Sequence, residues 1–234
     1  MKKIGIIGGL GPEATVDYYK EIIKSFDQIN GEGSFNYPEI IIYSVSLGKL
    51  LQLFEAKRYD ESVDYLVDAI SNLKNAGVDF AVLSANTPHL LFNQIQEKVD
   101  MPLISIVEAC AEKAKEMGLK NMGLLGTKFT MQNRFYQEVF DRLNTKLIVP
   151  DSEQIQYIHH KLFTEMELGV FKEETKNGFL DIISKLKSEQ NIDSIILGCT
   201  EFPIMFKDPE YLGMPFLNTT KIHVDAIVKE CLNG

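Results

Sequence analysis

The amino-acid sequence predicts an α/β fold of two pseudo-symmetric lobes, each a parallel sheet flanked by helices. Short apolar runs alternate with longer amphipathic stretches along the 234 residues, and this alternation is typical of α/β proteins with parallel sheets. Several runs are apolar at consecutive positions, as expected for strands that are covered on both faces. Two segments of the first half also recur in the second half.

The predicted strands are the short apolar runs, in order Ile4–Ile7, Glu39–Val45, Phe80–Leu83, Leu103–Ile106, Met122–Leu125, Leu147–Val149, Ser194–Leu197 and Pro215–Leu217. The predicted helices are the amphipathic stretches between them, in order Pro12–Phe26, Tyr59–Ala76, Val107–Met117, Met131–Leu143, Gln154–Leu168, Lys172–Ser188 and Thr219–Leu232. Pro12 suits the first turn of a helix. Gly77 and Gly118 stand where helix C-caps belong.

The recurring segments indicate an internal repeat. Residues 3–8 match residues 121–126, and residues 79–87 match residues 193–201, in the same order and at nearly equal spacing. The repeat predicts a first lobe of residues 1–98 plus 210–234 and a second lobe of residues 99–209. Open α/β sheets bind ligands at the carboxyl ends of their strands, so we expect the active site in the cleft between the lobes.

Composition excludes several classes of protein. The net charge is −9 and the 24 basic residues form no block, which argues against nucleic acid as a partner. No run reaches the roughly 18 apolar residues of a membrane span, and the apolar run near the N-terminus is too short for a secretory signal. Three scattered cysteines are too few for a disulfide framework. We therefore expect a cytoplasmic protein.

Cys199 is the strongest candidate for a catalytic residue. It follows a predicted strand and Gly198, and it precedes a predicted short helix. A helix N-terminus lowers the pKa of a thiol from about 8.5 and favours the thiolate, and Thr200 could bind an anion. Cys110 and Cys231 stand in helical stretches, and we interpret both as buried structural cysteines.

The first-half counterpart of this turn holds polar residues that could bind a carboxylate. Ser84, Asn86 and Thr87 follow the strand Phe80–Leu83, and they could equally cap the next helix. In the register of the repeat, Ala85 is the counterpart of Cys199.

No residue pattern calls for a cofactor or a metal. The glycines near Gly8 lack the spacing of a dinucleotide-binding loop, and no acidic residue follows the second strand. The four histidines lack the spacing of a zinc site.

These motifs resemble the aspartate/glutamate racemase family. The resemblance lies in residues 6–15, 85–89, 124–131 and 198–201, and it extends over essentially the whole chain. It implies a PLP-independent amino-acid racemase, often dimeric, that takes a proton from one face of the α-carbon and returns one to the other face. Asn86, Thr87 and Thr200 match positions that usually hold the substrate carboxylate, and Thr15 and Glu165 fall in stretches that resemble segments near the ligand.

The sequence departs from the family pattern at one base. Family members carry a cysteine or a threonine immediately before the Asn-Thr pair, where this chain has Ala85, and a methyl group cannot carry a proton. No residue of Ser46–Arg58 clearly matches the arginine or glutamine that often contacts the substrate, although Lys49 is a candidate.

Three functions remain open at this point. The chain could be a racemase in which Ser84, Thr87 or water replaces the missing base, although a hydroxyl is a weak base at neutral pH. It could be a single-thiol decarboxylase or isomerase that protonates one face only. It could also be an amino-acid-binding protein with impaired catalysis, and Ala85 could be either natural or engineered.

Overall fold

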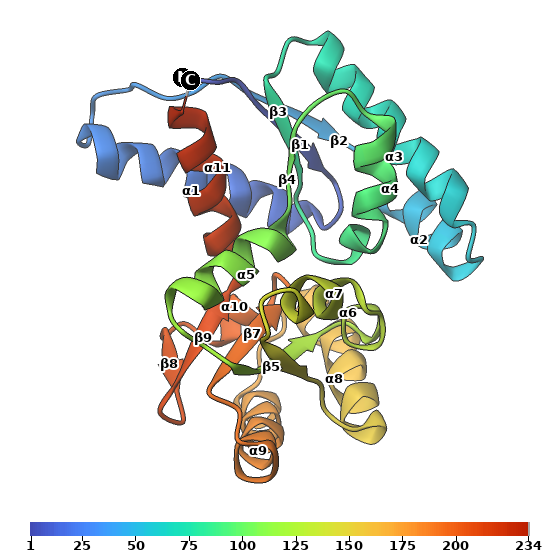
Figure 1. Ribbon diagram of the computed structural model, residues 1–234, viewed down its shortest axis with the longest axis vertical. Helices are drawn as coiled ribbons and strands as arrows, with labels where there is room; N and C mark the ends of the chain where they lie inside the picture. The colour runs from blue at the N-terminus through green and yellow to red at the C-terminus, as the bar shows by residue number, and fades with distance from the viewer. Residues whose placement is uncertain (234) are drawn as a thin grey trace. The chain divides into compact units, whose positions relative to one another are not determined.

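A computed structural model describes residues 1–233 and divides into two compact units. Unit 1 comprises Met1–Ile106 with the C-terminal segment from Thr220, and unit 2 comprises Val107–Thr219. Both are α/β, with parallel sheets and flanking helices, which confirms the predicted fold class (Figure 1).

The sheet of unit 1 has the strand order β2-β1-β3-β4, with all neighbours parallel. Its strands are β1 (Ile4–Gly8), β2 (Ile40–Ser44), β3 (Phe80–Leu83) and β4 (Leu103–Ile104). Its helices are α1 (Pro12–Asn30), α2 (Leu47–Glu55), α3 (Tyr59–Asn75), the 3-10 turn η1 (Thr87–Leu91), α4 (Phe92–Lys98) and α11 (Thr219–Leu232). Apolar side chains of α1 and α11, such as Phe26 and Ile227, pack with those of β1 and β3 into one buried cluster.

The sheet of unit 2 has the order β6-β5-β7-β9-β8, and only the short β8–β9 pair is antiparallel. Its strands are β5 (Asn121–Gly126), β6 (Lys146–Ile148), β7 (Ser194–Gly198), β8 (Glu210–Tyr211) and β9 (Met214–Asn218). Its helices are α5 (Ile106–Glu116), α6 (Lys128–Gln132), α7 (Phe135–Asp141), α8 (Ser152–Thr164), the 3-10 turn η2 (Met166–Leu168), α9 (Glu173–Gln190) and α10 (Phe202–Met205). Side chains of α8, α9 and α10 form a buried apolar cluster with β5, β7 and β9.

The internal repeat is present at the level of hydrogen bonds. Ile4 pairs with Phe80 in unit 1, and the residues that match them in the repeat, Met122 and Ser194, pair in unit 2. The Asp79 carboxylate accepts a hydrogen bond from the backbone N–H of Lys3 at 2.6 Å. Its counterpart Asp193 does the same with the N–H of Asn121, at 3.0 Å. The repeated strands therefore pair in the same register in both units.

The unit boundaries differ from the predicted lobes of residues 1–98 plus 210–234 and 99–209. That division assigns residues 103–106 to the second lobe and residues 215–217 to the first. In the structure, β4 pairs with β3 in unit 1, and β9 pairs with β7 in unit 2. These boundaries depend on which strands pair in each sheet. The repeat covers only two strands per lobe, so it does not reveal how the remaining strands pair.

Several predicted elements need correction. The predicted helix Met131–Leu143 is two short helices, α6 and α7, interrupted at Asn133 and Arg134. The strand at Leu103 is only two residues long, because Ile106 already begins α5. Helices α2 and α4 and strand β8 were not predicted. Gly77 and Gly118 have φ of +86° and +71°, which confirms their places after helix ends.

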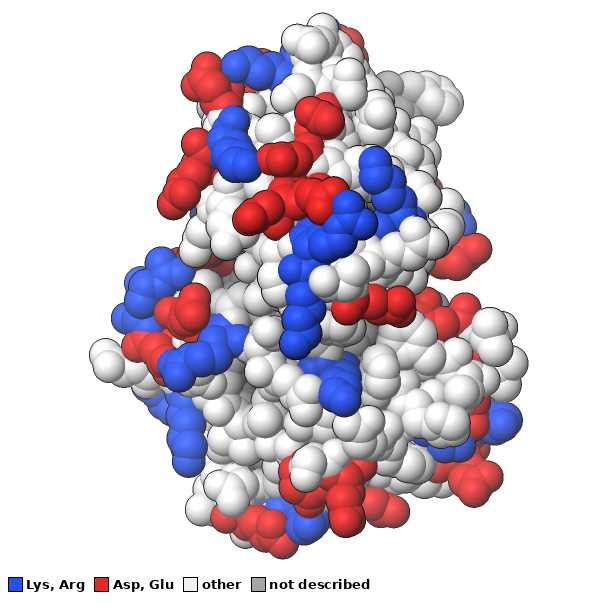
Figure 2. Space-filling model, turned by 90° about the vertical axis from the view of Figure 1, so that its right-hand side faces the viewer, with Lys and Arg blue, Asp and Glu red and all other residues white. Residues whose placement is uncertain are grey.

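The surface carries charges of both signs. Basic and acidic side chains are interspersed on the face drawn in Figure 2. Ion pairs such as Arg58–Glu61 join exposed partners, so salt screens them and each contributes little stability. Among residues 1–233, no helix has the length and apolar character that crossing a bilayer requires.

Candidate functional site

The Cys199 turn lies at the carboxyl end of β7, as the sequence predicts. All five residues of β7 are buried, and α10 begins three residues after Cys199. A β-carbon at Gly198 would lie 2.9 Å from the carbonyl oxygen of Leu125 on the neighbouring strand. Glycine is therefore required at 198, because β5 passes too close for any side chain.

The thiol of Cys199 is hydrogen-bonded to a buried carboxylate. Its Sγ donates to Glu201 Oε2 at 2.8 Å, and Thr200 Oγ1 donates to Glu201 Oε1 at 2.8 Å. Cys199 and Glu201 are only 8% and 9% exposed. Thr200 thus orients the carboxylate that receives the thiol hydrogen bond.

This environment corrects the expectation of a thiol with a lowered pKa. Burial, followed by the charge and hydrogen bond of Glu201 and the charge of Glu167, raises the pKa of Cys199 well above its ordinary value. Helix α10 has four residues and starts at Phe202, so its dipole is small. Cys199 therefore rests as a thiol and must pass its proton to a neighbouring group before it can act as a base.

Glu167 completes the group, and the sequence analysis missed it. It lies in the 3-10 turn η2, and ligand atoms of Glu167, Cys199 and Glu201 all lie within 4.8 Å of one another. Although its side chain is exposed, reduced hydration and the charge of Glu201 raise the pKa of Glu167 to about 7. A thiol and two carboxylates are donors that could hold a metal ion, but the thiol–carboxylate hydrogen bond already accounts for the closest of these contacts.

A wrong helix boundary hid Glu167 from the sequence analysis. In the predicted helix Gln154–Leu168, residues 165 and 167 would lie on different faces. A site that contained Glu165 would then exclude Glu167. In the structure α8 ends at Thr164, and the chain continues into η2. Gly169, with φ of +74°, follows Leu168 in either case, so the sequence carries no clear signal of the break after Thr164.

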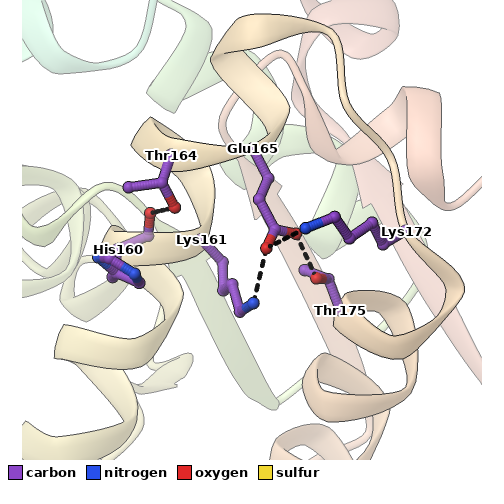
Figure 3. Close-up of polar contacts among 6 residues, drawn as sticks. All are labelled: His160, Lys161, Thr164, Glu165, Lys172 and Thr175. Atoms are coloured by element: carbon purple, nitrogen blue, oxygen red, sulfur yellow. Dashed lines mark hydrogen bonds and ion pairs between the residues drawn. The ribbon is translucent and has the colours of Figure 1, made fainter.

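Glu165, which is predicted to lie near the substrate, forms hydrogen bonds and ion pairs with other residues of unit 2 (Figure 3). Its carboxylate accepts from Lys161 at 2.6 Å, from Lys172 at 3.1 Å and from the Thr175 hydroxyl at 2.5 Å. These partners, Lys161 first and Thr175 second, lower the pKa of Glu165 to about 2. The contacts with Lys172 and Thr175 tie the end of α8 to the start of α9, so they support a structural role for Glu165.

In unit 1 the corresponding turn follows β3 and contains the residues predicted from the repeat. Asn86 is buried, whereas Ala85 and Thr87 are partly exposed. Ser84 is completely buried, and its hydroxyl donates to the carbonyl of Ile7 at 3.0 Å. That bond joins β3 to β1 and makes Ser84 a poor substitute for the missing base.

Thr15 connects the glycine turn after β1 to this region. Its hydroxyl accepts from the N–H of Gly9 at 2.9 Å and lies 3.5 Å from Ser84 Oγ. Thr15 and Ser84 are thus brought together, and both bind backbone at strand ends. Ala85 belongs to unit 1 and Cys199 to unit 2.

Lys49, the tentative substrate contact, lines a surface hollow of unit 1. The hollow measures about 470 Å³ and lies along α2 and α3. The ammonium of Lys49 stands 4.0 Å from the centre of the Tyr65 ring, within the range of a cation–π contact. None of the other predicted site residues lines this hollow.

Comparisons with known proteins match the chain to one family over most of its length. Residues 7–227 match the family Asp/Glu/Hydantoin racemase. The chain is 27% identical to the broad specificity amino-acid racemase RacX of Bacillus subtilis over 202 residues, 85% of each chain. Its sequence match to three glutamate racemases, such as that of Fusobacterium nucleatum, spans 42–64% of their length.

Two crystal structures cover 99% of this chain and the whole of their own chains. One, from Yersinia pestis and assigned to the Asp/Glu racemases, has 30% identity and a TM-score of 0.90. The other, an aspartate racemase homologue from Pyrococcus horikoshii OT3, has 33% identity and a TM-score of 0.84. Because the family match covers nearly the whole chain, this protein belongs to the Asp/Glu/hydantoin racemase family, a membership that supports an amino-acid racemase.

Proposed function

We propose that the protein is a PLP-independent racemase of an acidic amino acid such as aspartate or glutamate, with Cys199 as the group that exchanges the α-proton. The observation that carries the proposal is the 2.8 Å hydrogen bond from the Cys199 thiol to Glu201 at the carboxyl end of a buried strand. The names of the similar proteins, an amino-acid racemase and an aspartate racemase homologue, support the substrate class.

The reaction begins with the thiol proton. Cys199 passes it to Glu201, and the resulting thiolate takes the α-proton of the substrate, so that Cys199 is a thiol again and the substrate is a carbanion. The carbanion needs hydrogen-bond donors on its carboxylate, and Thr200, Asn86 and Thr87 are the groups proposed for that role. Thr87 or a water molecule then donates a proton to the opposite face, which gives the other enantiomer. The proton held by Glu201 neutralises, through solvent, the alkoxide or hydroxide that this donation leaves, so every group returns to its starting state.

Ala85 stands at the position from which the family's first base acts. In its place Thr87 or a water molecule would have to return the proton, which makes that half-reaction slow. Two further functions are compatible with the missing base. A single-thiol decarboxylase or isomerase would use Cys199 alone, and an amino-acid-binding protein with impaired catalysis would use only the pocket.

The decisive variant is Ala85→Cys, with Ala85→Ser as the control of similar size. A positioned acid–base group contributes about 10²–10⁴-fold to a rate. Ala85→Cys should therefore raise the rate of aspartate or glutamate racemisation at least about 100-fold, measured as loss of optical rotation, and Ala85→Ser should raise it much less. A normally folded Ala85→Cys variant with no gain would exclude the two-base reaction.

Cys199→Ser tests the thiol chemistry, and hydrogen exchange in the unaltered protein distinguishes the remaining functions. We expect it to abolish both racemisation and exchange of the α-hydrogen with deuterated water. If the unaltered protein exchanges the hydrogen of one enantiomer without forming the other, it is a single-thiol enzyme. If it does neither but is stabilised against heat by an amino acid, it is a binding protein.

We further propose a cytoplasmic homodimer that needs no cofactor and binds neither nucleic acid nor membrane. All three cysteines are unpaired, which suits a reducing compartment. The net charge of −9 is unfavourable for polyanions. Size-exclusion chromatography with light scattering should give twice the chain mass of 26.5 kDa, and a monomer would refute the dimer.

A further inference from the structure

The imidazole of His89 holds the backbone of the turn that contains Ala85. His89 lies in η1 and is 3% exposed. Its Nδ1 lies 2.9 Å from the carbonyl oxygen of Ala85, and its Nε2 lies 3.2 Å from the backbone nitrogen of Ile106. A carbonyl only accepts and an amide N–H only donates, so Nδ1 carries the proton and Nε2 is the acceptor.

A second buried histidine has the opposite arrangement. His223 in α11 is completely buried, and its Nε2 lies 2.9 Å from the carbonyl oxygen of Ile104, to which it must donate. Its Nδ1 lies 2.8 Å from the Tyr18 hydroxyl and accepts from it. The centres of the two imidazole rings are 6.2 Å apart. The pair thus binds both sides of the segment 104–106, through which the chain leaves unit 1.

Both imidazole rings are neutral near pH 7. Burial, followed by the nearby His223, lowers the pKa of His89 to about 3, and burial lowers the pKa of His223 to about 4. The other ionisable group in this cluster is Tyr18, whose pKa burial raises. Each ring therefore keeps one donor nitrogen and one acceptor nitrogen. Near neutral pH, His89 is not protonated and keeps both of its hydrogen bonds.

We propose that His89 is a positioning residue for the reaction, acting through the Ala85 carbonyl. The carbonyl of Ala85 and the amide of Asn86 belong to one planar peptide group. The hydrogen bond from Nδ1 therefore fixes the orientation of this peptide plane, and with it the backbone that positions Asn86 and Thr87. Those are the side chains proposed to bind the substrate carboxylate, and this part of the inference rests on the proposed function. The bond from Ile106 to Nε2 serves a separate, structural purpose.

Two variants separate these roles. His89→Asn places an amide donor near the position of Nδ1 and removes the acceptor for Ile106, whereas His89→Gln places an acceptor near Nε2 and removes the donor to Ala85. We expect His89→Asn to be less heat-stable but to keep its affinity for aspartate within about threefold. His89→Gln should lose about tenfold in affinity, the equivalent of one net hydrogen bond, measured by calorimetry. Equal losses in both variants would reduce His89 to a structural residue.

The tautomers provide a test that needs no turnover. Nuclear magnetic resonance of ¹⁵N-histidine-labelled protein should show His89 protonated at Nδ1 and His223 at Nε2, with neither titrating between pH 7 and pH 5. A protonated Nε2 on His89, or titration near pH 6.5, would overturn the inference even if the protein is an active racemase. If the tautomers are as expected but the unaltered protein binds no amino acid, the proposed function is wrong and His89 fixes the turn for another purpose.

Discussion

The three cysteines show how strongly the reactivity of a residue depends on its surroundings. Burial raises the pKa of all three thiols. Cys231 donates to the carbonyl oxygen of Lys2 at 3.1 Å, and an amide carbonyl is far too weak a base to take the thiol proton. Within residues 1–233, Cys199 is the one cysteine whose thiol donates to a carboxylate, so it has a neighbour that can accept the proton.

Glu201→Gln should separate the acidity of Cys199 from its activity. Removing the negative charge and the hydrogen bond that keep the thiol protonated should lower the pKa of Cys199, so alkylation by iodoacetamide should begin at a lower pH than in the unaltered protein. Proton exchange at the substrate should nevertheless fall, because the carboxylate that is hydrogen-bonded to the thiol is gone and only the less closely placed Glu167 remains. Peptide mass spectrometry distinguishes Cys199 from Cys110 and Cys231. An alkylation profile shifted to higher pH would contradict this account.

Glu165→Gln tests whether Glu165 is structural. Its folded pKa of about 2 lies below the ordinary 4.5, so its stabilising effect is present above pH 4.5 and is lost as the pH falls towards 2. The variant should melt at a lower temperature at pH 7, and the difference should vanish near pH 2. Glu153→Gln, at an exposed position of the same helix, should change little. Unchanged stability with weakened aspartate binding would instead support the ligand role predicted from the resemblance.

At the scale of elements, the strand ends depend on glycine where two backbones meet. Gly9 follows β1 with φ of +73°, and a β-carbon there would lie 2.3 Å from the carbonyl oxygen of Val45. Gly77 follows α3 with φ of +86°, and a β-carbon there would meet nothing within 4 Å. Both positions have a positive φ, and they differ in the space available to a side chain.

Gly9→Ala and Gly77→Ala should therefore differ in cost. Gly77→Ala should lower the free energy of unfolding by about 1–2 kcal/mol, the cost of a left-handed conformation for an L-residue. Gly9→Ala should lose that and a further ~1–3 kcal/mol of overpacking. Urea denaturation measures both. Equal losses would show that the turn after β1 can move away from β2.

Helix boundaries in unit 2 show the limit of periodicity. Apolar spacing alone predicts one helix over 131–143, but the chain breaks between α6 and α7 at Asn133, which has an extended backbone. Phe135, Tyr136 and Phe140 are buried all the same, so the pattern identifies the buried side chains correctly while the helix itself is interrupted.

At the scale of the whole molecule, the two units should respond differently to acid. His89 and His223, both in unit 1, are neutral and buried, with folded pKa values of about 3 and 4, below the ordinary 6.5. The unfolded chain binds these two protons first, so stability is lost as the pH falls below 6.5, by about 1.4 kcal/mol per pH unit for each ring. In unit 2 the pKa of His159 is also lowered, but that ring is only partly buried.

Hydrogen exchange at pH 7 and pH 5, corrected for the intrinsic rates, measures this difference. Amides of β1 and β3 should lose protection in acid by more than those of β5 and β7. His223→Gln should be less stable than the unaltered protein at pH 7 and should lose less on acidification. Equal losses of protection in the two units would show that the buried histidines do not determine the acid response.

The sequence by itself determined the positions of every strand except the short β8, the two-lobe α/β class and the turn of Cys199, because buried strands and the internal repeat leave local patterns in the sequence. It also identified Ala85 as the counterpart of Cys199. Only the tertiary structure decided that β4 and β9 pair across the predicted boundaries, that Glu201 and Glu167 surround the thiol, and that Glu165 is paired with two lysines. These features depend on contacts between segments distant along the chain, and the pKa of a thiol or carboxylate follows from its buried neighbours in space rather than from its neighbours in sequence.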